Sequence, residues 1–385
     1  MKKLLIVTAL AATSTVASAF DYKFNVEGRA DFVNANVKST AQTTGVETSE
    51  KYNNFSNNLI RLNMMGTVNE NLSYRFRYRF AKEAANPVST NTSGTSGATT
   101  AREITNTTQV DYLYIDHKNS LFTTRFGKQN WNGFSYGREG IVSGTDVFLV
   151  SQAAANYKSA FGSDYRYGVT AMFKFMDTNT LDLAISNPNT TVTDITGTEV
   201  KNTGLAYGAF YTGSFMNKLV QPILAYQLAK QNSDADHTTP ASRTQDVNYT
   251  MWNAGLRSEV AGAIIDADYK ELKKPNRNTS ATTTAANKEQ KTKSIYANVA
   301  YAVGDFTPIA TYINDKYTTE DNATAANANF KRNSFAVGTY WRPMSDVNFR
   351  YHLMVTNAVT KYEGTFATNT KVNDTKVYFG FKADI

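Results

Sequence analysis

The sequence predicts an all-β fold, a transmembrane antiparallel up-and-down β-barrel. The 385 residues include 23 Tyr and 22 Phe but only 7 Pro, a composition that favours half-buried strands. Apolar and polar residues alternate along several segments, and the connections between these segments alternate between short and long. We expect sixteen strands, with fourteen or eighteen as the alternatives.

The composition argues against several other classes of protein. The chain has no Cys, which excludes a disulfide framework and thiolate metal sites. Its 40 Lys and Arg residues outnumber its 33 Asp and Glu residues only slightly, and they are spread along the chain. Nucleic-acid-binding proteins concentrate basic residues on one face or tail, so we expect no nucleic-acid partner.

The first nineteen residues have the pattern of a secretory signal peptide. Residues 1–3 (MKK) are positively charged, residues 4–12 form an apolar core, and residues 17–19 (ASA) form a small-residue cleavage site. A membrane-anchoring helix needs about 20 apolar residues, roughly twice the length of this core. We predict cleavage after Ala19, which leaves residues 20–385 as one barrel domain. Cleavage removes two lysines, so the net charge falls from +7 to +5.

Strict alternation with a period of two marks individual strands. In residues 72–80 (LSYRFRYRF), five apolar side chains alternate with Ser73 and three arginines. Residues 22–32, 347–355 and 377–385 show the same pattern. Strands with one apolar and one polar face need a closed barrel in lipid, because an open edge would leave backbone groups unpaired.

The spacing of these segments supports closure. The turn at 69–71 is short, whereas residues 91–97 and 279–287 belong to long connections rich in Thr, Asn, Ser and Ala. Residues 177–202 are ambiguous, because 181–185 could form a further strand or a hairpin inside a loop. The sixteen predicted strands are 21–37, 57–68, 72–84, 104–116, 121–130, 153–161, 165–176, 203–212, 219–230, 247–259, 263–273, 294–303, 306–317, 333–343, 347–359 and 373–385.

Three arginines distinguish a membrane barrel from a soluble β-sandwich or β-helix. Arg75, Arg77 and Arg79 share one strand face and lie about 6.6 Å apart. Facing lipid, each would cost about 2–4 kcal/mol at the bilayer midplane, so this face must meet water. A soluble fold would then need a core for the opposite, apolar face of nearly every strand, and we therefore favour the barrel.

Three segments carry a resemblance to a known family. Residues 110–115 (VDYLYI) and 121–129 (LFTTRFGKQ) are similar to the fourth and fifth strands of the Gram-negative trimeric, general diffusion porins. Residues 373–385 resemble the C-terminal strand by which the barrel assembly machinery recognises outer-membrane barrels, although Ile385 replaces the usual terminal aromatic residue. The resemblance implies a sixteen-stranded homotrimer that forms a water-filled channel without a cofactor.

The resemblance also implies where the channel is narrowest. In these porins the loop after the fifth strand folds into the lumen, the space inside the barrel, and its acidic residues oppose a basic cluster on the wall. The corresponding loop is about 130–152, and it contains several glycines that permit tight folding. Its charged residues are Arg138, Glu139 and Asp146, and the basic wall positions are Arg61, Arg75, Arg77, Arg79 and Arg125.

The sequence offers little other chemistry. His117, His237 and His352 have no metal-ligand spacing, so we interpret each as a solvated polar residue and expect no metal site. Asp266 and Asp268 share one strand face, which indicates a lumen lining that attracts cations. No catalytic motif or Ser/His/Asp set is evident, so we do not expect an enzyme.

These observations predict an outer-membrane porin of a Gram-negative bacterium. It would allow passive diffusion of ions and small hydrophilic solutes, with a weak preference for anions because of the wall arginines. One alternative is a substrate-specific porin for phosphate or another anion. Another is a plugged barrel that acts as an adhesin or structural protein through its external loops. In each case the surroundings are outer-membrane lipid and lipopolysaccharide.

Overall fold

The computed structural model describes most of the predicted barrel. The predicted signal peptide, residues 1–19, lies outside the described residues, as do Arg138, Glu139 and Asp146 of the predicted loop. The described residues are 21–41, 44–81, 109–131, 148–154, 161, 165–187, 191–193, 199–201, 204–231, 247–276, 288–320, 329–363 and 369–385.

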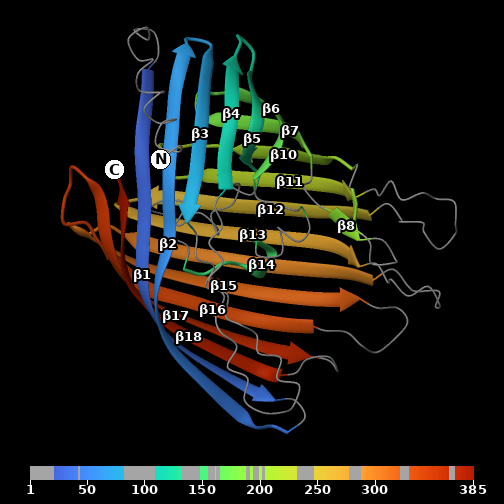
Figure 1. The fold of residues 1–385 in the computed structure, drawn as a ribbon, viewed down its shortest axis with the longest axis vertical. Helices are drawn as coiled ribbons and strands as arrows, with labels where there is room; N and C mark the ends of the chain where they lie inside the picture. The colour runs from blue at the N-terminus through green and yellow to red at the C-terminus, as the bar shows by residue number, and fades with distance from the viewer. Residues whose placement is uncertain are drawn as a thin grey trace, which may run out of the picture.

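Sixteen strands of the described chain close into one antiparallel barrel, which confirms the predicted fold class. Figure 1 shows the strands following one another round the sheet in chain order, from blue to red. The first and last strands pair directly and complete the ring. The strands are β1 (Asp21–Ala41), β2 (Glu47–Asn69), β3 (Leu72–Ala81), β4 (Gln109–Lys118), β5 (Thr123–Asn130), β6 (Tyr165–Phe175), β7 (Asn179–Ser186), β10 (Ala206–Thr212), β11 (Gln221–Gln231), β12 (Val247–Val260), β13 (Ala263–Asn276), β14 (Lys288–Tyr301), β15 (Phe306–Glu320), β16 (Asn329–Trp341), β17 (Asn348–Glu363) and β18 (Asn369–Asp384).

The connections differ at the two ends of the barrel. At one end, the short-turn end, they span two to eight residues, as between β2 and β3 or β12 and β13. At the other, the long-connection end, they span five to thirty-four residues. This asymmetry is the one that bacterial outer-membrane barrels show.

In the ambiguous stretch 177–202, residues 181–185 form a further strand, one of the two structures that the sequence allowed for them. β7 is a wall strand that pairs with β6 and β10. The following connection carries a separate two-stranded sheet of β8 (Thr191–Thr193) and β9 (Glu199–Lys201). The sixteenth wall strand therefore comes from this stretch.

The predicted strand at 153–161 is wrong. Gln152, Ala153 and Ala154 are helical, and Ala153 and Phe161 pack inside the barrel. Ala153 and Phe161 meet lumen side chains rather than lipid, which explains why the pattern of this segment resembled that of a wall strand. The described residues contain no helix long and apolar enough to span a membrane.

Inward and outward residues alternate along each long strand, as β16 illustrates. Ala336 is 3% exposed and lies in the barrel interior, whereas its neighbours Phe335 and Val337 are 48% and 55% exposed. Near the short-turn end, outward aromatic side chains pack into a girdle. Phe306 stacks on Trp341 with ring centroids 6.1 Å apart, and Trp341 stacks on Tyr351 at 5.4 Å. The outer surface is therefore apolar in its middle and aromatic at this edge.

Candidate pore constriction

In the connection between β5 and β6 (residues 131–164), the described residues lie inside the barrel. Its described residues, Trp131, 148–154 and Phe161, contact the inner wall at three places. The inward-folded loop expected from the family resemblance is therefore present.

The first contact is made by Trp131, directly after β5. Its indole packs with Ala184, Phe210 and Ala225, and Nε1 donates a hydrogen bond to the carbonyl oxygen of Arg166 at 3.1 Å. Gly168 makes room for the ring, because a Cβ there would lie 2.7 Å from Trp131 Cζ2. The loop thus leaves β5 with its first residue attached to the wall.

The second contact begins at Phe148. Its ring centroid lies 5.1 Å from that of His352 and 5.2 Å from that of Tyr378, in edge-to-face geometry. The guanidinium carbon of Arg29 lies 4.5 Å from the Phe148 centroid, a cation–π contact. These partners belong to β17, β18 and β1, so Phe148 lies beside the seam where the barrel closes.

Backbone groups of the next residues bond to charged and polar wall side chains. Asp315 Oδ1 accepts a hydrogen bond from Gln152 N at 2.8 Å, and Ser294 Oγ accepts one from Ala153 N at 3.1 Å. Arg332 Nη2 donates to the Val150 carbonyl at 2.8 Å and also binds Asp315 at 2.6 Å. Asp315 therefore fastens the loop to β14, β15 and β16.

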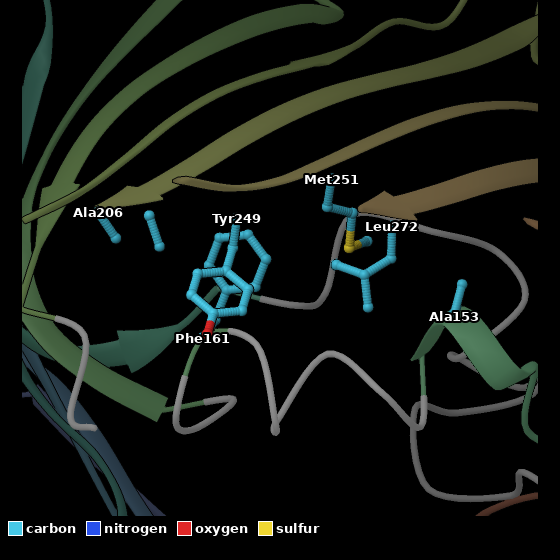
Figure 2. Close-up of a cluster of buried hydrophobic side chains, with 7 residues drawn as sticks. Ala153, Phe161, Ala206, Tyr249, Met251 and Leu272 are labelled. Carbon is cyan, nitrogen blue, oxygen red and sulfur yellow. The ribbon is translucent and has the colours of Figure 1, made fainter. Parts of the chain in front are cut away.

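The third contact is an apolar cluster around Phe161. Figure 2 shows Tyr249 of β12 beside Phe161, with Met251 and Leu272 together to one side and Ala153 of the helical turn beyond them. These side chains are buried together within the lumen. The described loop residues are thus held on the wall by packing and by hydrogen bonds, with partners on strands from β6 round to β18 and β1.

Three of the five arginines predicted on the wall converge on one carboxylate. Asp111 on β4 is fully buried, and its Oδ1 lies 2.6 Å from Arg79 Nη2. Its Oδ2 lies 3.2 Å from Arg61 Nε and 3.3 Å from Arg77 Nε. The three arginines come from β2 and β3, and each residue is less than a tenth exposed.

A β-bulge directs Asp111 into the lumen. On β3, Arg77 is opposite Tyr112 and Tyr78 is opposite Val110, so Asp111 has no partner residue on that strand. The extra residue lets Asp111 and Tyr112 both point inward, although strict alternation would separate them. Tyr112 lies under Arg77, with 3.9 Å between the guanidinium carbon and the ring centroid.

Arg75 and Arg125 lie on the same wall, closer to the short-turn end. Arg75 Nε donates to Asn63 Oδ1 at 3.0 Å, and Arg125 pairs with Asp116 through two hydrogen bonds of 2.7 and 2.8 Å. Arg75 and Asp116 line a cavity of about 310 Å³. Of the wall arginines, Arg75 therefore borders open space in this part of the lumen.

A second polar group lies at the closing seam. Asp31 on β1 pairs with Arg29 at 2.9 Å and with His352 Nε2 at 2.7 Å. His352 lies on β17, one strand beyond β18, and Gly380 of β18 lies between the two residues. A Cβ at Gly380 would lie 2.6 Å from Asp31 Oδ1 and 2.8 Å from His352 Nε2, so the missing side chain permits the contact.

The seam corrects one interpretation and extends the basic wall. His352 is buried and paired, not a solvated residue. Lys382 Nζ lies 2.9 Å from Glu27, which also pairs with Arg61 at 3.4 Å. From β1 to β4 and on β17 and β18, six buried cationic side chains surround three carboxylates. The cations are Arg29, Arg61, Arg77, Arg79, Arg350 and Lys382, and the carboxylates are Glu27, Asp31 and Asp111.

Asp266 and Asp268 lie across the lumen from the arginine wall, on β13, and both are buried. Asp266 pairs with Arg257 at 2.7 Å and accepts a hydrogen bond from Asn298 at 3.4 Å. The charge of Asp266 is therefore balanced by a neighbouring arginine. This reduces the attraction for cations that the sequence suggested at this position.

None of the three carboxylates of the basic wall was among the site residues predicted from the sequence. Asp31 and Glu27 share the alternating inward positions of residues 22–32, so their placement could have been read from the pattern. Asp111 could not, because only the bulge turns it inward. Among the described residues, no group of three or more acidic or histidine side chains is arranged to hold a metal ion.

A closed sixteen-stranded barrel, apolar outside and charged within, with a long connection attached to its inner wall, defines a membrane-spanning β-barrel of the porin type. A model of the Gram-negative porin family matches residues 7–381, so the chain belongs to this family. A search of curated proteins finds no match to the sequence.

Solved outer-membrane barrels share this architecture. In-vitro folded OmpT, an outer membrane protein of Vibrio cholerae, is 11% identical, with a TM-score of 0.58 over 96% of this chain and 98% of its own. Its trimer form aligns with a TM-score of 0.57 at 10% identity, over 96% of this chain and all of its own. Salmonella typhi OmpF, solved with daunomycin, gives 0.56 at 13% identity, over 95% and 98% of the two chains. At these identities the likeness concerns the fold.

Proposed function

We propose that the protein is an outer-membrane porin that allows passive diffusion of ions and small hydrophilic solutes. The observation that carries the proposal is the lumen itself. One part of its wall holds the described residues of the β5–β6 connection, and another presents Arg75 and Asp116 to a cavity of about 310 Å³. A charged, water-accessible lining narrowed by an attached loop suits diffusion of polar solutes. The channel would need no cofactor and would catalyse no reaction.

We further propose a weak preference for anions. The basic wall carries more cationic than anionic buried side chains, and the excess raises the local anion concentration. Asp111 and Glu27 neutralise part of the arginine charge, which makes the preference weak. The charges of Glu139 and Asp146 would oppose it wherever they meet the ion path.

Single-channel recording tests both parts of the proposal. The purified mature protein is inserted into a planar bilayer under a KCl gradient. Stable conductance steps are expected, with a reversal potential whose sign indicates anion preference. Correctly folded barrels that remain silent would refute the diffusion channel and favour a plugged barrel acting through its external loops. A reversal potential of the opposite sign would refute the anion preference alone.

A substrate-specific anion channel is the second candidate, and the convergence of Arg61, Arg77 and Arg79 favours it. Such a channel would bind its substrate, so its conductance would saturate with phosphate concentration and phosphate would block chloride current. A conductance that rises linearly with phosphate concentration would refute the substrate-specific channel and support the general porin. The engagement of all three arginines by Asp111 leads us to expect the linear result.

The biogenesis follows the same proposal. Residues 1–19 would direct export and be removed after Ala19, and residues 373–385 would engage the barrel assembly machinery. N-terminal sequencing of the mature protein tests the cleavage site. We propose a homotrimer, for which unheated gel electrophoresis should show a band about three times the mass of the heated monomer. A monomeric band under conditions that keep the barrel folded would refute the trimer.

A further inference from the structure

Five lysines from five consecutive strands form one row across the outer surface. Each is directly opposite the next in the strand register. Successive lysines are ten to thirty residues apart in the sequence, so the row cannot be recognised as a local sequence motif. The lysine row comprises Lys293 of β14, Lys316 of β15, Lys331 of β16, Lys361 of β17 and Lys371 of β18.

The lysine row faces away from the lumen. On β16, Lys331 has the parity of the exposed residues Phe335 and Val337, whereas Arg332 points inward to Asp315. On β15, Lys316 likewise alternates with the buried Asp315. Adjacent strands are about 4.8 Å apart, so the row extends for about 19 Å around the barrel.

The lysine row lies one membrane thickness from the aromatic girdle. Lys331 is ten residues from Trp341 along β16, a length of about 33 Å at 3.3 Å per residue. With strands tilted by about 40°, this corresponds to about 25 Å along the barrel axis, the height of the apolar band of such barrels. The girdle is at the short-turn end, so the lysine row marks the membrane interface at the long-connection end.

Neighbouring carboxylates balance only part of the row. Glu271 lies 3.8 Å from Lys293 and also pairs with Lys273 and Lys291, while Glu363 pairs with Lys331 at 3.1 Å. Lys316, Lys361 and Lys371 have no ion pair with any other described residue. Like charges directly opposite on neighbouring strands repel, so the row favours an anionic partner.

We propose that the lysine row binds the phosphate groups of lipopolysaccharide in the outer leaflet. The inference rests on the proposed outer-membrane location, which places the long connections outside the cell and the row at the headgroup level. Basic clusters at a membrane interface recognise anionic headgroups. A second copy of the chain is a poorer partner, because its contact would have to bury five adjacent positive charges. Asn314 and Asn333 share a hydrogen bond of 2.6 Å. They lie two residues from Lys316 and Lys331, between the lysine row and the apolar band.

The test uses a triple variant, Lys316→Gln, Lys361→Gln and Lys371→Gln. Binding of fluorescently labelled lipopolysaccharide to the folded protein in detergent is measured by anisotropy. The expected loss of affinity is roughly 100-fold, about fivefold for each lysine. The corresponding triple Lys→Arg variant should retain binding, because it keeps the charge.

A matched control removes the same charge at the short-turn end, through Lys174→Gln, Lys218→Gln and Arg342→Gln. It should bind lipopolysaccharide as the wild type does. Unchanged affinity in the lysine-row variant, or an equal loss in the control, would overturn the proposal. Equal wild-type binding to phosphatidylglycerol vesicles or to dephosphorylated lipopolysaccharide would overturn the choice of ligand.

Conductance separates this inference from the proposed function. The lysine-row variant should keep the wild-type conductance, because its side chains lie outside the lumen. A wild-type barrel that shows no conductance but still binds lipopolysaccharide would refute the proposed channel. The proposed lipopolysaccharide binding by the lysine row would remain supported. Conducting barrels whose affinity does not depend on the row would refute the inference and leave the channel.

Discussion

At the scale of single residues, two small features organise the charged wall. The bulge at Asp111 brings one carboxylate to three arginines, and Gly380 lets Asp31 and His352 meet across β18. Neither a β-bulge nor a glycine by itself suggests a functional site. The bulge turns Asp111 inward, and Gly380 leaves room for the contact between Asp31 and His352.

Asp111→Asn should make the channel more selective for anions. The substitution keeps the size of the side chain but leaves Arg61, Arg77 and Arg79 without their shared negative charge. Breaking a buried ion pair in this way should also lower the free energy of unfolding by about 3 kcal/mol. Reversal potentials and urea titrations of the folded barrel measure the two effects. An unchanged reversal potential would show that the ion path does not pass this cluster.

Gly380→Ala should destabilise the barrel by about 1–3 kcal/mol, the usual cost of overpacking. The new methyl group would meet Asp31 Oδ1 and His352 Nε2 and separate them. Gly28→Ala is the matched control on the neighbouring strand, since its Cβ would meet no atom within 4 Å. Denaturant titrations should distinguish the two variants. Equal stability of both would contradict the role assigned to Gly380.

At the scale of elements, the β5–β6 connection is the part of the chain that departs from the barrel pattern. The wall strands bury one face and expose the other. Residues 148–154 instead lie inside the barrel, attached to its inner wall by the packing of Phe148 and Ala153 and by backbone hydrogen bonds. Asp315 binds one of these backbone groups directly, and it also binds Ser294 and Arg332, which bind two others. It accepts hydrogen bonds from Gln152, Ser294 and Arg332.

Asp315→Asn should loosen the connection without breaking the barrel. Hydrogen bonds to a charged group contribute about 1.5–3 kcal/mol, and their loss should increase open-channel noise and mean conductance. Asp116→Asn is the control, because Asp116 binds Arg125 and none of the described loop residues. Single-channel traces of the two variants provide the measurement. Identical noise in Asp315→Asn and wild type would mean that Asp315 does not restrain the loop.

At the scale of the whole molecule, closure replaces disulfides as the source of rigidity. The chain has no cysteine, and its ends are joined by backbone pairing of β1 with β18 and by reciprocal hydrogen bonds between Val26 and Ile385 of 2.6 and 3.0 Å. Every wall strand has two neighbours, so no edge is left open to lipid. The lumen charges are thereby held in fixed positions.

The proposed anion preference should weaken as salt concentration rises. The Debye length falls from about 10 Å at 0.1 M to about 3 Å at 1 M, so the wall charges act over a shorter part of the lumen. Reversal potentials measured with the same tenfold KCl gradient, centred at low and at high salt, should therefore decrease at high salt. A preference independent of salt would point instead to a specific anion-binding site.

Much of the fold could be predicted from local pattern. The alternation in residues 72–80 and 347–355 led to strands β3 and β17, and the position of the inward loop followed from the family resemblance. The prediction at 153–161 failed because an apolar segment that lines the lumen has the same composition as one that meets lipid. For residues 181–185 the sequence did not decide between a wall strand and a hairpin inside a loop. A strand this short has the same pattern in both places.

The sequence by itself determined that the chain is a membrane barrel with a wet and an apolar face, because a period of two is a property of each strand alone. Only the tertiary structure decided which charges meet. The three arginines and Asp111, the Asp31 and His352 pair, and the lysine row each join residues from different strands. Their contacts depend on register and on one bulge, and a shift of one residue would move every side chain to the other face.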